Sequence, residues 1–151
     1  MTGRQFDVVI IGGAVMGSAA AFWLTRLAGQ GIKVLVLEAD PSYARASTAL
    51  SVASIRQQFS NSINVKISRY GIEFIKNISE MTGSDGGVTD LGLNENGYLF
   101  LAGSAGNAAL MEELRQMQRA EGAATELLDR AALAARFPWL ALDGVSMGSF
   151  G

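Results

Sequence analysis

The sequence predicts an α/β fold that opens with two parallel β-strands joined by a helix. Two short apolar runs rich in β-branched residues, Val8–Ile11 and Val34–Leu37, have the composition of buried parallel strands. The stretch between them begins with glycines and continues with helix-forming residues, and Gly29 and Gly31 end it. This order of strand, glycine turn, helix and strand predicts a Rossmann-like βαβ unit.

This unit predicts a dinucleotide-binding site. We expect a helix over residues 18–28, whose first N–H groups and dipole can bind a pyrophosphate without a basic side chain. Gly12 allows a tight turn after the first strand, and the small residue Gly17 lets the helix lie close to the sheet. Glu38 ends the second strand, 21 residues after Gly17, where its carboxylate can accept hydrogen bonds from ribose hydroxyls.

One position departs from the glycine pattern of dinucleotide-binding turns. The pattern G-x-G-x-x-G places glycines at positions 12, 14 and 17, and this chain has Ala14 at the second of them. A glycine there normally lets the backbone come close to the pyrophosphate. The methyl group of Ala14 is either accommodated by a small shift or weakens binding, and a βαβ unit that binds nothing is the alternative.

The segment from Arg45 to Ser60 combines hydroxyl groups, two arginines and small residues, without the period of a helix or a strand. Arginine and hydroxyl side chains suit phosphate oxygens, and small residues suit a backbone that lies against a flat ring. An ordinary polar loop fits the same composition equally well.

The rest of the chain predicts alternating helices and strands. Ser62 is expected to cap a helix that runs to about Ser79, with a core-facing stripe of Ile63, Ile67, Tyr70, Phe74 and Ile78. Residues 82–87 are expected to form a loop. The further expected elements are a strand at 98–102, a helix at about 107–121 with Leu110, Leu114 and Met117 inward, a strand at 126–128, a short helix capped by Asp129 and ended by Phe137-Pro138, and a strand at 145–150.

Composition excludes several classes of function. The 151 residues carry a net charge of −2 without a basic block, so nucleic acid is not an expected partner. The absence of cysteine and histidine excludes a disulfide, a Cys/His zinc site, a cysteine nucleophile and a Ser-His-Asp triad, and no metal site is expected. The uncharged run from Val8 to Leu24 is shorter than the ~20 residues of a membrane span. We expect a cytoplasmic chain without a membrane span.

Several stretches resemble one known family. They read DVVIIGGAVMG at 7–17, VLVLE at 34–38, and RAST at 45–48 followed by SIRQQF at 54–59. These stretches are similar to the amino-terminal part of FAD-dependent oxidoreductases of the D-amino-acid oxidase family, and more closely to its sarcosine oxidase and dimethylglycine dehydrogenase branch. Residues 128–140 also resemble a segment of that family's substrate domain. The resemblance implies FAD as the cofactor, a small amine or amino acid as the substrate, and oxidation of its C–N bond by hydride transfer to the flavin.

The resemblance also implies which residues contact the cofactor. The glycine turn would hold the pyrophosphate, Glu38 the adenosine ribose, and residues 45–48 the phosphate side, while residues 51–56 would run beside the flavin ring. Arg56 is the candidate for binding a substrate carboxylate. Its alternative role is to support the flavin or the backbone. No other catalytic residue is assigned. The implied cofactor-binding residues are Gly12, Gly13, Ala14, Val15, Met16, Gly17, Glu38, Ala39, Arg45, Ala46, Ser47, Thr48, Ser51, Val52, Ala53, Ser54, Ile55 and Arg56.

Family members are much longer, so the resemblance implies a truncated chain that is inactive alone. Residues 1–83 would be the amino-terminal part of an FAD-binding domain, and residues 84–151 the beginning of a mixed α+β substrate domain. Some relatives attach the flavin covalently through a histidine after the Ser-Thr pair, but this chain has Ala49 and Leu50 there, which implies non-covalent FAD.

Two other functions remain open from the sequence. One is a non-catalytic dinucleotide-binding module or subunit that self-associates or needs a complementing chain. The other is an NAD-dependent dehydrogenase, which Glu38 permits because an acid at this position suits any unphosphorylated ribose. The sequence specifies neither the substrate nor the electron acceptor.

Overall fold

The computed structural model describes residues 4–29, 31–83, 90–103 and 105–151. They form two compact units, Met1–Ser54 and Ile55–Gly151. The predicted domain boundary after residue 83 adjoins residues outside the described ranges and stays a prediction. Within the described ranges, no helix is long and apolar enough to cross a membrane.

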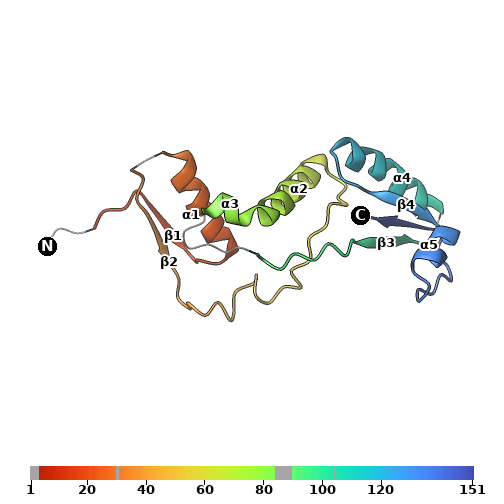
Figure 1. Ribbon diagram of the computed structural model, residues 1–151, viewed down its shortest axis with the longest axis horizontal. Helices are drawn as coiled ribbons and strands as arrows, with labels where there is room; N and C mark the ends of the chain where they lie inside the picture. Colours follow the sequence, from red (N-terminus) through yellow and green to blue (C-terminus); the bar gives the residue numbers. More distant parts are fainter. Residues whose placement is uncertain (1–3, 30, 84–89, 104) are drawn as a thin grey trace. The chain divides into compact units, whose positions relative to one another are not determined.

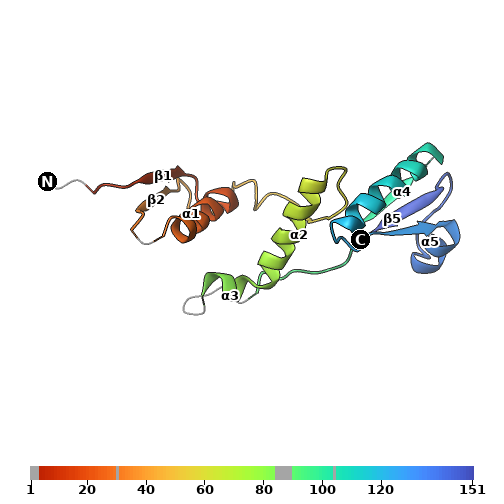
Figure 2. The ribbon, with the colours of Figure 1, turned by 90° about the horizontal axis from the view of Figure 1, so that it is seen from above.

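The first unit is a two-stranded parallel sheet with one helix. β1 (Val8–Ile11) pairs with β2 (Val34–Leu37) in a register that places Ile11 beside Leu37. α1 (Val15–Leu27) connects the strands and packs against both (Figures 1 and 2). Both predicted strands and the α/β fold class are confirmed. The helix begins at Val15, three residues ahead of the predicted start at residue 18, with Ala14 as its N-cap residue.

Only one face of this sheet carries a helix of the unit. Along β1, Val8 and Ile10 are half-buried, whereas Val9 and Ile11 are 53% and 89% exposed. The apolar run predicted a strand buried on both faces, as in larger parallel sheets. That expectation is wrong for the described chain, because α1 covers one face of a sheet that has only two strands.

The second unit contains an antiparallel sheet. β3 (Leu99–Ala102) and β4 (Glu126–Asp129) flank β5 (Met147–Phe150), which is the central strand (Figure 1). α4 (Ala105–Ala120) packs against all three strands, and α5 (Arg130–Arg136) packs against β4 and β5. The three predicted strands are confirmed, and α4 begins slightly before the predicted residue 107.

The predicted cap of α5 is confirmed. The Asp129 side chain accepts a hydrogen bond from the Ala132 N–H at 2.8 Å, which satisfies one of the free donors at the start of the helix. The helix ends at Arg136, directly before Phe137 and Pro138, as the sequence predicts.

The predicted helix after Ser62 is divided into α2 (Ser62–Lys76) and α3 (Ile78–Thr82). The cap of α2 is Asn61 rather than Ser62, since the Asn61 side chain accepts the Ile63 N–H at 3.0 Å. The Ser62 hydroxyl instead donates to the Glu121 carboxylate at 2.6 Å. Of the predicted loop 82–87, residues 84–87 lie outside the described ranges.

The apolar stripe predicted for this helix takes its core position only toward its end, where Ile78 is buried and Phe74 is half-buried. Ile63, Ile67 and Tyr70 are all exposed, while Val65, which lies off the stripe, is fully buried. The helical period identifies an apolar face but does not specify what covers it. The buried apolar side chains of the described residues all lie in the second unit and are Val65, Ile78, Ala102, Ala123, Leu128 and Leu133.

We predict that Leu133→Ala destabilises the second unit by about 2–5 kcal/mol, because it leaves a cavity in the core. Leu133 is fully buried, and its Cδ2 would lie 2.7 Å from a Cβ added at Gly148. Leu110→Ala is the matched control. Leu110 was predicted to point inward, but this is wrong, since the residue is 51% exposed and its truncation should cost about 0.5 kcal/mol or less. Urea unfolding followed by circular dichroism measures both changes, and equal losses would contradict the core assignment.

Candidate functional site: the carboxyl edge of the parallel sheet

The glycine turn and Glu38 meet where β1 and β2 end. Gly12 has a φ of +97°, in the left-handed region that favours glycine, and its N–H donates to the Leu37 carbonyl at 2.7 Å. The next N–H, of Gly13, donates to Glu38 Oε2 at 2.7 Å. The turn therefore ties the ends of the two strands together with one backbone bond and one charge-assisted bond.

Glu38 is held as a carboxylate by backbone donors. Its second oxygen, Oε1, accepts the Asp40 N–H at 2.9 Å. The N–H groups of Asp40 and then Gly13 hold the pKa of the Glu38 carboxyl below its ordinary value. An ionised carboxylate offers about four acceptor positions, so Glu38 can still accept hydrogen bonds from ligand hydroxyls.

The start of α1 adds backbone donors beside this acid. Ala14 is the N-cap residue in an extended conformation, and the first helical bond runs from the Ser18 N–H to the Ala14 carbonyl at 2.9 Å. The N–H groups of the first turn have no partner within an α-helix, and no described side chain caps this end. An anion is favoured there by these donors and by the helix dipole.

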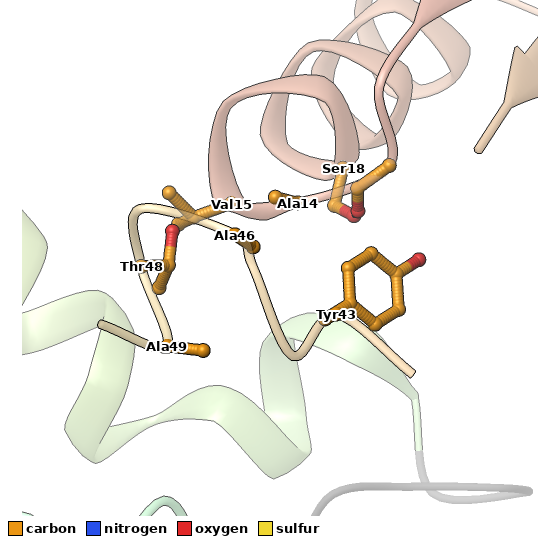
Figure 3. Close-up of a pocket in the computed structure, with 8 residues that line it drawn as sticks. Ala14, Val15, Ser18, Tyr43, Ala46, Thr48 and Ala49 are labelled. Atoms are coloured by element: carbon orange, nitrogen blue, oxygen red, sulfur yellow. The ribbon is translucent and has the colours of Figure 1, made fainter. Parts of the chain in front are cut away.

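A pocket of about 340 Å³ lies at this end of α1 (Figure 3). Figure 3 shows Val15 and Thr48 at one end of the pocket and Ser18 and Tyr43 at the other. The Ser18 hydroxyl donates to the Gly13 carbonyl at 2.5 Å, which holds the turn against the helix. The lining residues are Gly13, Ala14, Val15, Ser18, Tyr43, Ala46, Thr48 and Ala49.

The structure gathers part of the predicted site in this pocket. Gly13, Ala14, Val15, Ala46 and Thr48 line it, as members of the predicted glycine turn and of the predicted phosphate segment. The predicted residues of the first unit that do not line it are Gly12, Met16, Gly17, Glu38, Ala39, Arg45, Ser47, Ser51, Val52, Ala53 and Ser54. Their contact with a cofactor stays a prediction.

Three lining residues were missed by the sequence analysis. Ser18 follows the glycine turn by one helical turn, and Ala49 follows Thr48, so both could have been found by extending the predicted segments. Tyr43 has no comparable signal, since its ring reaches the pocket through the turn of residues 40–46.

A close backbone contact requires glycine at position 17, and a side chain approaches Gly13 closely. A Cβ at Gly17 would lie 1.8 Å from the carbonyl oxygen of Gly12, which is backbone and cannot move aside. A Cβ at Gly13 would lie 2.8 Å from the hydroxyl oxygen of Tyr43. Gly17 thus has the close helix–strand packing role of the last glycine in a dinucleotide-binding turn.

Ile55 and Arg56 belong to the second unit. The Arg56 guanidinium carbon lies 4.8, 5.9 and 5.3 Å from the ring centroids of Phe59, Tyr98 and Phe100, within the range of cation–π contacts. The backbone carbonyl of Arg56 accepts a hydrogen bond from the Ser68 hydroxyl. These contacts support the alternative, structural role of Arg56, and its catalytic role stays a prediction.

Comparisons with known proteins agree with this geometry. Residues 7–150 match the DAO family, described as FAD dependent oxidoreductase. The chain therefore belongs to this family of FAD-dependent oxidoreductases. It is 49% identical over 151 residues to FAD-dependent oxidoreductase domain-containing protein 1 of Bos taurus, and 43% identical over the same length to that of Xenopus laevis.

These matches cover 98% of this chain but only 31% and 30% of the two relatives, so the chain spans about a third of their length. Among solved structures, the fold is similar to L-proline dehydrogenase from P. horikoshii, with a TM-score of 0.72, 25% identity, and 98% of this chain and 37% of that chain covered. Glycine oxidase from Bacillus cereus shares the fold with a TM-score of 0.61 and 20% identity, over 97% of this chain and 38% of that one.

The residues present fit the cofactor of this family. Free helix N–H groups suit the pyrophosphate of FAD, and an ionised Glu38 with spare acceptor positions suits its ribose hydroxyls. The methyl group of Ala14 lines the pocket in place of the second glycine. When bound, the flavin supplies the capacity to accept a hydride, and the chain supplies its placement.

We predict that Gly17→Ala lowers the free energy of unfolding of the first unit by about 3 kcal/mol, because its Cβ would collide with the Gly12 carbonyl. A Trp139→Phe background leaves Trp23 of α1 as the only tryptophan, so its fluorescence reports this unit. Gly71→Ala is the control in the second unit: α2 has open space there, and the stability of that unit, followed by circular dichroism, should rise by about 0.5–1 kcal/mol. A neutral Gly17→Ala would contradict the packing role.

We predict that the stabilising effect of Glu38 disappears in acid. Because the native pKa of Glu38 lies below its unfolded value of about 4.3, the contribution is fully present above that unfolded value. It is lost as the pH falls through the lowered native pKa. The difference in unfolding free energy between wild type and Glu38→Gln should therefore be constant near neutral pH and shrink in acid. A difference that stays unchanged down to about pH 2 would contradict this.

Proposed function

We propose that this chain binds FAD non-covalently at the carboxyl edge of its parallel sheet. The observation that carries the proposal is the joint placement of Glu38 and the start of α1 around Gly13. The Gly13 N–H contacts the Glu38 carboxylate at 2.7 Å, and α1 begins two residues later with free N–H groups. An acceptor for ribose hydroxyls and donors for a pyrophosphate therefore lie side by side.

Non-covalent attachment is supported by the composition of the chain. The resemblance implies that some relatives attach the flavin through a histidine after the Ser-Thr pair, and this chain contains neither histidine nor cysteine. Binding must then rely on hydrogen bonds, the helix dipole and shape, all of which are reversible.

For the reaction, we propose oxidation of the C–N bond of a small amine or amino acid, with hydride transfer to the flavin. The support comes from similarity to a protein described as L-proline dehydrogenase, at 25% identity over 98% of this chain, together with membership of the family. The chain spans about a third of its curated relatives. We therefore expect it to bind FAD by itself but not to catalyse the reaction by itself.

The proposal predicts saturable FAD binding that depends on Glu38. We expect titration of the purified chain with FAD, followed by flavin absorbance and fluorescence, to reach saturation. Glu38→Ala should weaken the dissociation constant roughly tenfold or more, because it removes a charged acceptor from the ribose site. NAD added as a competitor should not displace the flavin; displacement at equal concentration would favour the NAD-dependent alternative.

An arginine pair provides a matched control within the same unit. Arg45 lies in the segment predicted to contact phosphate, whereas Arg26 lies in the last turn of α1, at the opposite end of the helix from the pocket. Arg45→Ala should weaken FAD binding and Arg26→Ala should not. A folded wild-type chain that binds no FAD would overturn the proposed function, and a flavin-free dimer would favour the non-catalytic alternative.

A further inference from the structure

Tyr43 has an unusual backbone conformation. Its φ is +55°, in the left-handed region that bulky side chains rarely adopt. The Tyr43 N–H donates to the Asp40 carbonyl at 2.9 Å, and its own carbonyl accepts the Ala46 N–H at 2.9 Å. The Asp40 side chain in turn accepts the Ser42 N–H at 3.0 Å. Two consecutive turns thus impose a conformation that glycine or asparagine would adopt more readily.

This conformation brings the tyrosine side chain to the glycine turn. Tyr43 lines the pocket beside Ser18 (Figure 3), and a Cβ at Gly13 would lie 2.8 Å from the Tyr43 hydroxyl oxygen and 3.5 Å from Glu38 Cβ. The phenol group therefore lies next to Gly13, whose N–H donates a hydrogen bond to the Glu38 carboxylate. The residue is 39% exposed, so burial of the ring does not account for the unfavourable backbone.

We propose that Tyr43 is a binding residue for the ADP half of the dinucleotide. This inference rests on the proposed FAD site. The ring lines the pocket next to Gly13, whose N–H contacts the Glu38 carboxylate, and the hydroxyl would donate a hydrogen bond to a phosphate or ribose oxygen bound there. Backbone strain that persists at such a position is expected where the side chain serves a ligand.

The backbone strain at Tyr43 allows a ligand-binding role of its ring to be distinguished from a purely structural one. If the ring mainly stabilised the loop, its removal would lower both stability and affinity. If it serves the ligand, replacement by a residue suited to the left-handed region removes strain and binding together. The ligand-free chain then keeps or gains stability while its affinity falls.

The test uses the whole chain with Tyr43→Asn, Tyr43→Phe and the control Ala44→Gly, which changes the same turn without lining the pocket. We expect Tyr43→Asn to leave the Tm of the ligand-free chain unchanged or raised. The dissociation constants of both FAD and ADP should rise roughly tenfold, as loss of an aromatic contact and a hydrogen bond predicts. For Tyr43→Phe, which removes only the hydroxyl, the dissociation constants should rise by less than for Tyr43→Asn. Ala44→Gly should bind FAD as wild type does.

Two results would overturn the inference while leaving the proposed function in place. One is wild-type affinity for FAD or for ADP in Tyr43→Asn. The other is a Tm that falls together with the affinity, which would make the ring structural. Failure of the wild-type chain to bind both FAD and ADP would overturn the proposed function and this inference with it.

Discussion

The hydrogen bond from the Gly13 N–H to the Glu38 carboxylate is the contact on which the first unit depends. It joins the turn after β1 to the end of β2, and α1 begins two residues after Gly13. The same carboxylate faces the ribose in the proposed complex, and the same turn presents the donors for the pyrophosphate. The groups that would bind the ligand are thus oriented by the fold before the ligand arrives, which reduces the entropic cost of binding.

Much of this edge can be predicted from the sequence because its signals are local. The apolar runs of β1 and β2 end at Ile11 and Leu37 in the structure as in the sequence. Gly12 adopts the positive φ that a glycine at a strand end suggests, and Glu38 follows β2 directly. Each of these features is determined by a residue and its immediate neighbours, so one sequence is sufficient to find them.

The remaining features depend on contacts between distant residues. The stripe of α2 has the correct period, yet Ile63 and Ile67 are exposed because no described element covers that face. Tyr43 reaches Gly13 only because two turns rotate its backbone into the left-handed region. A periodic pattern does not show what covers a helix face, and it does not show where a loop side chain points. The pocket, which includes the loop residue Tyr43, could therefore be predicted only in part.

The central claim is that the carboxyl edge of the β1–β2 sheet binds the dinucleotide. The most direct measurement is a titration of the isotope-labelled chain with FAD, followed residue by residue through backbone amide chemical shifts. We expect saturable changes concentrated at Gly13, Ala14, Val15 and the segment that begins at Glu38. Saturable binding that leaves these amides unchanged and shifts only residues of the second unit would contradict the account.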